Sequence, residues 1–162
     1  MSKDLAKLEQ LIFKAMKKIP NQAVKIIKAE GLNHIERNFK QQRFLNGQVE
    51  QKWQKRNAQG KYSEVYKTNR VGRKGTLNRY GRKNEGRAIL VGHNTAGNKL
   101  RNSFRTKINR RKQVVFYTYK PYAKRHNEGL DGMPKRQFMG YSKYLDTKIK
   151  NKLNKELDKH FK

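Results

Sequence analysis

Residues 104–139 decide the fold, and they read FRTKINRRKQVVFYTYKPYAKRHNEGLDGMPKRQFM. β-Branched and aromatic side chains concentrate in two short runs of this stretch, Phe104 to Ile108 and Val114 to Tyr119. Such runs predict β-strands. The residues between them, Asn109 to Gln113, are polar and basic, as in a turn. The stretch therefore begins with a predicted β-hairpin.

A short helix is predicted after the hairpin. Pro121 has the fixed φ angle that suits a first helical turn, and Gly129 suits the left-handed residue that follows a helix. The helix should therefore span Tyr122 to Glu128. Residues 130–134 are then predicted to form a turn, and Arg136 to Met139 a third strand.

Two helices are predicted near the N-terminus. Apolar residues recur at helical spacing over residues 3–19, and Pro20 is expected to end this helix and to start a second one over about 21–43. Gly31 lies on the apolar stripe of the second helix. A glycine in that position permits close packing or a kink.

The C-terminal helix is predicted over about 142–160, with Ser142 as a candidate N-cap. Its apolar residues recur every four positions: Leu145, Ile149, Leu153, Leu157 and Phe161. A further short helix is expected from Thr95, as its cap, to Phe104.

These elements predict an α+β fold with long N-terminal helices, a small antiparallel β-sheet with a short inserted helix, and a C-terminal helix. We expect one domain with three parts. Residues 1–45 form the N-terminal helices, 46–87 a basic, glycine-rich arm or loop, and 88–162 the α+β core with the C-terminal helix. The core must be small, because only 34% of the residues are hydrophobic and 33% are charged. An average globular domain is roughly 45–50% apolar and about 25% charged.

The charge of the chain predicts a polyanionic partner. Lys and Arg number 41 against 12 Asp and Glu, a formal net charge of +29 over 162 residues. Such an excess attracts nucleic acid or an acidic protein surface. The chain contains no cysteine, which excludes disulfides and thiolate metal sites. No apolar run is long enough to span a bilayer. The basic, amphipathic first helix suits a membrane surface or packing on the rest of the domain or on a neighbouring subunit. Packing is the favoured interpretation, so we expect no membrane partner.

Basic side chains crowd the arm over 52–87, where tyrosines and glycines are interleaved with them. They can neutralise nucleic-acid phosphates, or pack on acidic neighbouring subunits. Both interpretations stay open. The candidate contacts in the arm and in the hairpin turn are Arg70, Arg73, Lys74, Arg79, Arg82, Lys83, Arg110, Arg111 and Lys112.

The sequence offers little for catalysis. The four histidines, His34, His93, His126 and His160, show no spacing suited to a shared metal ion. A hydrolytic cluster of His126, Glu128 and Asp131 would need more converging carboxylates than this chain supplies. We predict no catalytic residues, no metal, no cofactor and no enzymatic activity. His126 is expected to bond backbone groups where its helix stops.

The segment from Lys99 to the C-terminus shows an ordered set of motifs. LRNSF at 100–104 is followed by the hairpin, PYAKRHNEG at 121–129, MPKRQFMG at 133–140 and a charged helix. This order resembles the tail-completion or virion-morphogenesis proteins of tailed bacteriophages. Upstream, Phe39 on a long helix, and Gly47 and Trp53 before a basic loop, are also similar. The motif residues are Leu100, Pro121, Tyr122, Ala123, His126, Gly129, Pro134, Arg136 and Phe138.

The resemblance implies structural roles for these residues. Tyr122 and Ala123 would bury against the sheet, and His126 and Gly129 would close the short helix. Arg136 would contact a carboxylate or backbone carbonyls, and Phe138 would join the core. The arm is longer and more basic than in the family, so its role is not carried over.

The resemblance also implies a structural virion protein at the phage head–tail junction, assembled in the host bacterial cytoplasm. It would form a homo-oligomeric ring, often of six copies, that binds portal or adaptor proteins and tail or tail-tube proteins. Non-specific contact with packaged DNA fits the charge. The apolar stripes of the first and last helices are candidate subunit contacts. The alternatives are a small basic nucleic-acid-binding protein and, third, a nuclease that depends on His126.

Overall fold

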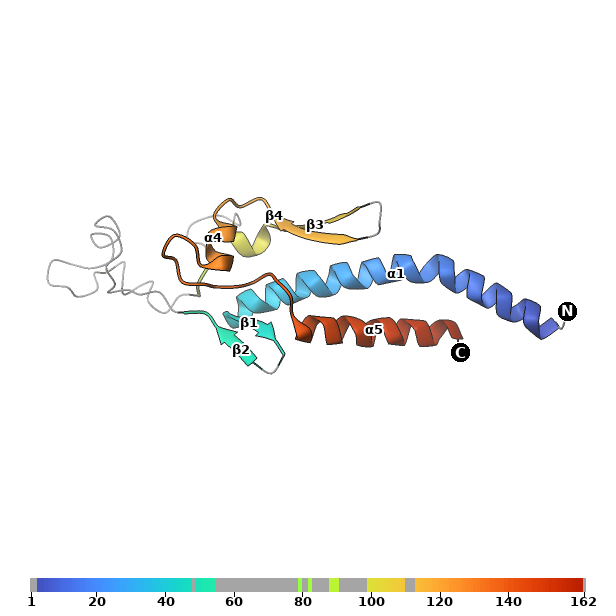
Figure 1. The fold of residues 1–162 in the computed structure, drawn as a ribbon. Coiled ribbons are helices and arrows are strands. Elements are labelled where there is room, and N and C mark those ends of the chain that lie inside the picture. The colour runs from blue at the N-terminus through green and yellow to red at the C-terminus, as the bar shows by residue number, and fades with distance from the viewer. Residues whose placement is uncertain are drawn as a thin grey trace.

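The structure is a computed structural model that describes residues 3–47, 49–54, 79, 82, 88–90, 99–109 and 113–161. One long N-terminal helix lies beside a shorter C-terminal helix, and the strands and a short helix gather near one end of the pair (Figure 1). The architecture is the α+β fold that the sequence predicts. The two small antiparallel sheets are separate, each with two strands.

The long helix, α1, spans Lys3–Gln41 without interruption. The prediction that Pro20 separates two helices was therefore wrong. A proline inside a helix removes one N–H donor and crowds the carbonyl of the preceding turn. These effects can bend a helix without ending it. Figure 1 shows α1 as bent along its length. With 39 residues, α1 is about 58 Å long.

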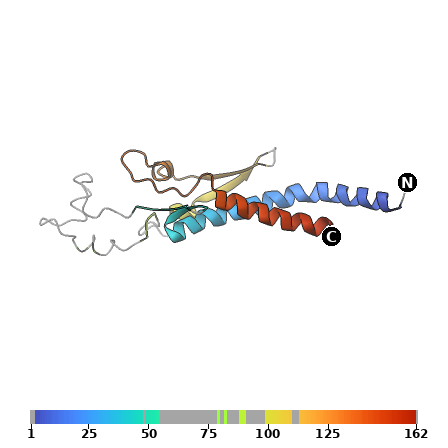
Figure 2. The same cartoon turned by 60° about the horizontal axis from the view of Figure 1, so that its bottom comes forward.

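The C-terminal helix, α5, spans Lys143–Phe161 and confirms the predicted one. Figures 1 and 2 both show it beside α1 and running in the opposite direction. Ser142 caps it as expected, because its hydroxyl accepts a hydrogen bond from the Leu145 N–H at 3.2 Å. Four apolar side chains of α5 are half-buried, namely Leu145, Ile149, Leu153 and Leu157, and α1 is the main element that the helix contacts.

A hairpin that the sequence analysis missed follows α1. Strand β1, Arg43–Asn46, pairs antiparallel with β2, Val49–Lys52, and Asn46 lies opposite Val49. Gly47 turns the chain with a φ of 84°, which favours glycine. Strands of four residues are too short for an alternation of apolar and polar residues to stand out in the sequence. The Asn46-Gly47 pair was the one available hairpin signal.

The predicted hairpin is confirmed in the second sheet. Strand β3, Phe104–Ile108, pairs antiparallel with β4, Val114–Thr118. In place of the expected helix up to Phe104 there is a single 3-10 turn, η1, at Leu100–Asn102. Thr95, the expected cap, lies outside the described residues.

The inserted helix, α4, spans Ala123–Glu128. Gly129 ends it as predicted, with a φ of 75° and its N–H bonded to the Arg125 carbonyl at 3.0 Å. Arg136 to Met139 do not form the predicted third strand. Side chains take up several of the hydrogen bonds of this segment, as described below, so it needs no neighbouring strand.

The core is an aromatic cluster at the C-terminal end of α1. Phe39 is its centre, with ring centroids 5.2 Å from Trp53, 5.2 Å from Phe138 and 5.7 Å from Phe104. Such edge-on and tilted contacts are favourable for aromatic rings. The full buried cluster is Ile35, Phe39, Trp53, Ile89, Leu100, Phe104, Ala123 and Phe138.

Gly31 brings the β3–β4 hairpin close to α1. A Cβ atom at Gly31 would lie 2.1 Å from Cζ of Phe116, on β4. No larger residue fits there unless the ring moves. Of the two roles expected for Gly31, the structure shows close packing.

We therefore expect Gly31→Ala to destabilise the protein by about 1–2 kcal/mol, although alanine favours a helix by about 1 kcal/mol over glycine. Thermal and urea unfolding would measure the loss. Asn33→Ala, at an exposed position of the same helix, is the control and should change little. In a Phe116→Leu background the Gly31→Ala change should cost much less. A stabilising Gly31→Ala in the natural chain would contradict the close contact.

Candidate functional site

The motif residues of the C-terminal half build a corner around an extended segment, residues 133–142, which we call the strap. The Asn127 side-chain oxygen, on α4, accepts hydrogen bonds from the N–H groups of Phe138 and Met139 at 3.0 and 2.9 Å. The Trp53 indole N–H donates to the Gln137 carbonyl at 2.8 Å. The strap is thus held by side chains from α4 and from the end of β2.

Asn38 of α1 ties the strap to the first sheet. Its side-chain N–H donates to the Phe138 carbonyl at 3.3 Å, and its oxygen accepts from the Leu45 N–H at 3.1 Å. Asn38 is 0% exposed. At the far end of the strap, the Ser142 hydroxyl donates to the Leu45 carbonyl at 2.6 Å. The sequence analysis missed Asn38 and Asn127, because no local pattern marks an amide that bridges distant segments.

Arg136 is buried in the strap. Its Nε donates to the Gln54 carbonyl at 3.1 Å, and its backbone N–H donates to the His126 carbonyl at 2.8 Å. This bond confirms the backbone carbonyl as one of the partners expected for the guanidinium. The contact closes the corner between the end of β2 and α4.

The other motif residues fall into two groups. Leu100, Ala123 and Phe138 are buried, as expected for structural residues. Pro121 is exposed and Pro134 is half-buried. The expectation that Tyr122 buries against the sheet was wrong, because its side chain is 41% exposed. Tyr122 immediately precedes α4, and its ring lies edge-on to His126, with centroids 6.0 Å apart.

Removing the Asn127 contacts tests whether these hydrogen bonds stabilise the strap. Asn127→Ala would leave two strap N–H groups without an acceptor, at about 1–3 kcal/mol for each buried donor. We expect urea unfolding to show a loss of about 2 kcal/mol or more. Asn127→Asp keeps an acceptor oxygen and should lose less.

Asn151→Ala, at an exposed position of α5, is the matched control and should be neutral. Equal stability of Asn127→Ala and Asn151→Ala would show that the strap does not depend on these bonds.

His126 does not sit in a constellation suited to metal binding. Among the described residues, no group of three or more His, Asp or Glu side chains could hold a metal ion. Its Nδ1 is buried and has no hydrogen-bond partner there. The bond expected from the His126 side chain to backbone groups is not seen at Nδ1; it is the main-chain carbonyl of His126 that accepts, from the Arg136 N–H. Burial, followed by the charges of Arg136 and Arg125, lowers the pKa of His126, so the neutral imidazole is favoured.

Charged side chains meet between α1 and α5. Glu30 is buried and lies 2.5 Å from Lys152 Nζ and 3.3 Å from Lys148 Nζ. The Lys152 hydrogen bond leads the effects that hold the pKa of Glu30 below its usual value, and burial opposes them. Two cations thus neutralise one buried carboxylate. Together they offset the cost of removing the Glu30 carboxylate from water better than a single ion pair would.

His34 lies one helical turn beyond Glu30, between Phe44 and Tyr144. It is 5% exposed, and neither ring nitrogen has a hydrogen-bond partner among the described residues. Burial, followed by the charges of Arg37 and Lys148, lowers the pKa of His34 to about 4. The folded protein therefore contains the neutral ring at neutral pH.

Stability should fall in mild acid for this reason. The unfolded chain binds a proton on His34 near pH 6.5, whereas the folded chain binds it only near pH 4. Between these values the proton favours unfolding, by up to about 1.4 kcal/mol per pH unit. The free energy of unfolding should thus decrease from pH 7 to pH 5. His34→Leu should flatten this dependence, and parallel curves for the two proteins would rule out His34 as its source.

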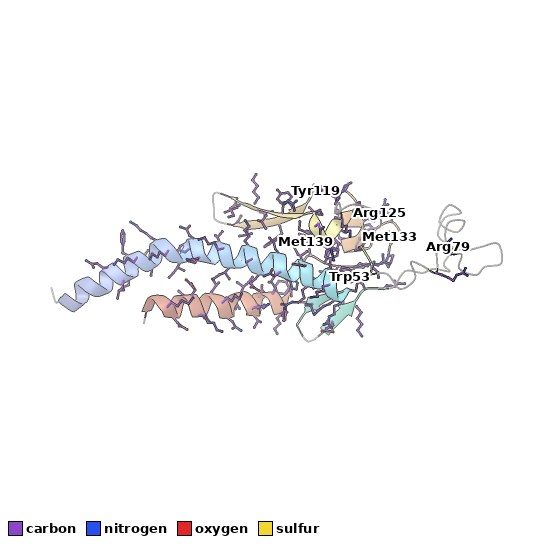
Figure 3. The ribbon with its side chains drawn as sticks, turned by 180° about the vertical axis from the view of Figure 1, so that it is seen from behind. Trp53, Arg79, Tyr119, Arg125, Met133 and Met139 are labelled. Carbon is purple, nitrogen blue, oxygen red and sulfur yellow. The ribbon has the colours of Figure 1, made fainter. Side chains whose placement is uncertain are left out.

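Two of the predicted basic contacts lie among the described residues. Arg79 and Arg82 are exposed. Figure 3 labels Arg79. The other candidates lie outside the described residues: Arg70, Arg73, Lys74, Lys83, Arg110, Arg111 and Lys112.

The N-terminal part of α1 extends past the end of α5 (Figures 1 and 2). We call residues 10–19 the overhang. It exposes several apolar side chains: Leu11, Ile12, Phe13 and Met16. Met16 is 69% exposed, and Lys17 Nζ lies 4.3 Å from the centre of the Phe13 ring. No helix of the described residues is long and apolar enough to cross a bilayer.

The fold and this corner define an α+β protein in which an antiparallel helix pair carries two small sheets and a cross-linked strap. Comparison of the chain with models of protein families, with curated proteins and with solved structures finds no match.

Proposed function

We propose that the protein is a structural virion protein at the head–tail junction of a tailed phage, a subunit of a tail-completion or neck ring that joins or caps head and tail. The observation that carries this proposal is the ordered set of motifs from Lys99 to the C-terminal helix. Each motif alone is short. Their order and spacing together resemble that family of proteins.

The geometry of the motif residues supports a structural role. Ala123 and Phe138 are buried, and Arg136 and Gly129 fix the path of the backbone. These residues shape the corner around the strap. They are engaged in packing and in main-chain bonds, which is what a subunit of a rigid ring requires.

The overhang supports the formation of a ring. Of the two apolar stripes expected to make subunit contacts, that of α5 is half-buried from Leu145 to Leu157 and lies beside α1. The overhang of α1 instead exposes Leu11, Ile12, Phe13 and Met16, although Ala15 within it is buried. A heterologous contact, in which the overhang of one copy packs on a different surface of the next, closes into a ring when the rotation permits. In the family that the motifs resemble, such rings often have six copies.

The net charge of +29 supports acidic partners at such a junction. Basic faces would speed docking on portal, adaptor, tail or tail-tube proteins. A basic lining would also hold the phosphates of DNA that passes through the ring.

The test is a phage that lacks this gene, complemented with variants and viewed by electron microscopy. Without the gene we expect filled heads beside unattached or overlong tails, or leaking heads in a short-tailed phage. The natural gene should restore joined particles. Phe13→Ser with Met16→Ser should fail to restore them, because it removes apolar contact area from the overhang.

The matched control is Lys14→Ser with Lys18→Ser, which changes exposed polar positions on the same part of α1 and should restore particles. Circular dichroism must show that both variants fold. Infectious particles without the gene would refute the head–tail role.

The alternative function, a small basic nucleic-acid-binding protein, is favoured by one observation. The β3–β4 hairpin exposes tyrosines beside Arg and Lys. Gel retardation across salt concentrations separates the two proposals. Sub-micromolar, sequence-selective binding by the isolated monomer at physiological salt would favour the alternative.

A further inference from the structure

The outer face of the β3–β4 hairpin is the one turned away from α1. On the inner face, Phe104 belongs to the core and Phe116 packs on Gly31. Side chains alternate along a strand, so the side chains of Arg105 and Lys107 on β3 and of Val115 and Tyr117 on β4 point to the opposite side. Figure 3 shows Tyr119 on this outer side. The outer face consists of Arg105, Lys107, Val115, Tyr117 and Tyr119.

Two exposed aromatic residues belong to the outer face, Tyr117 near the end of β4 and Tyr119 just after it. Tyr117 is 46% and Tyr119 57% exposed. They are two residues apart, which in an extended chain corresponds to about 6.8 Å. Two flat rings at this interval form a platform on which successive bases can stack.

Cations surround these rings. Arg105 lies opposite Tyr117 in the strand register, and its guanidinium carbon is 5.8 Å from the centre of the Tyr119 ring. The guanidinium is held in place, because Nη1 donates to the carbonyls of Asn102 and Phe104 at 3.0 and 2.8 Å. Lys120 Nζ lies 5.1 Å from the same ring.

The charge of this region has one sign. Residues 99–120 contain no Asp or Glu. Lys107 lies opposite Val115 on the same face as the tyrosines. Any ligand of this face must therefore be anionic, and it must also offer flat apolar groups for the exposed rings.

We propose that the outer face binds single-stranded nucleic acid. Bases stack on Tyr117 and Tyr119, and Arg105, Lys107 and Lys120 bind the phosphates of the same nucleotides. An acidic protein surface would satisfy the cations without using the rings. A duplex keeps its bases inside and would also leave the rings unused. The combination of rings and cations thus selects a strand with exposed bases.

This inference deepens the alternative function, a nucleic-acid-binding protein, by naming its site and ligand, and it does not depend on the head–tail role. Loss of the tyrosines is tested on the isolated full chain, whereas the head–tail role is tested on particles. Either proposal can fail alone.

The experiment measures fluorescence anisotropy of a labelled thymidine oligomer of roughly 12 nucleotides, within the range of known single-strand sites. Tyr117→Ala with Tyr119→Ala should weaken binding about tenfold or more. Tyr117→Phe with Tyr119→Phe keeps the rings and should bind as the natural chain does. Tyr141→Ala is the matched control, because Tyr141 is 74% exposed outside this face. Thermal unfolding of each variant checks that it folds.

Salt dependence tests the phosphate contacts. Lys107→Ala should reduce the slope of log affinity against log salt concentration by about 0.7, the value for one phosphate contact on a single strand. An unchanged slope would remove Lys107 from the site.

Four results would overturn the proposal. The double alanine variant binds like the natural chain, or Tyr141→Ala loses as much affinity. A duplex of the same length binds equally well with the same dependence on the tyrosines. Polyglutamate displaces the oligomer as well as unlabelled thymidine oligomer does, which would assign the face to an acidic protein.

Discussion

The buried amide of Asn38 is the interaction on which the arrangement of the chain depends. It binds the Leu45 N–H on one side and the Phe138 carbonyl on the other, so α1, β1 and the strap meet at one side chain. A buried amide tolerates little displacement of its partners, because an unpaired polar group in the interior is costly. The aromatic cluster around Phe39 buries the apolar surface of the core. Asn38 fixes how the segments that carry these rings are aligned with one another.

The protein combines this small core with a large excess of positive charge. Between α1 and α5, two lysines neutralise the buried carboxylate of Glu30, and the nearby His34 stays uncharged. Arg136 is buried as well and bonds to a backbone carbonyl, whereas Arg105, Lys107 and Arg125 are exposed. The structural stability and the attraction for polyanions thus reside in different parts of the molecule, so the outer surface can gain or lose a cation without disturbing the core.

The sequence predicted the elements whose signals are local. The β3–β4 hairpin, α5 and the glycine that ends α4 follow from alternation, four-residue spacing and backbone conformation. The errors arose where distant contacts decide. Pro20 lies within one continuous helix, and the segment at Arg136 to Met139 bonds to side chains instead of to a strand. In the candidate site, Phe138 could be assigned to the core, but its amide partners come from residues up to 100 positions away.

The antiparallel helix pair has a consequence for synthesis of the protein. Lys152 and its partner Glu30 are 122 positions apart, and the chain between α1 and α5 is on the order of 100 residues long. At about 5–20 residues per second, a ribosome needs roughly 5–20 seconds to make that connection. During this time α1 has left the ribosome without the helix that covers it. The lysines spaced along α1 then repel other nascent chains, so the positive charge that we propose for binding would also delay aggregation before folding is complete.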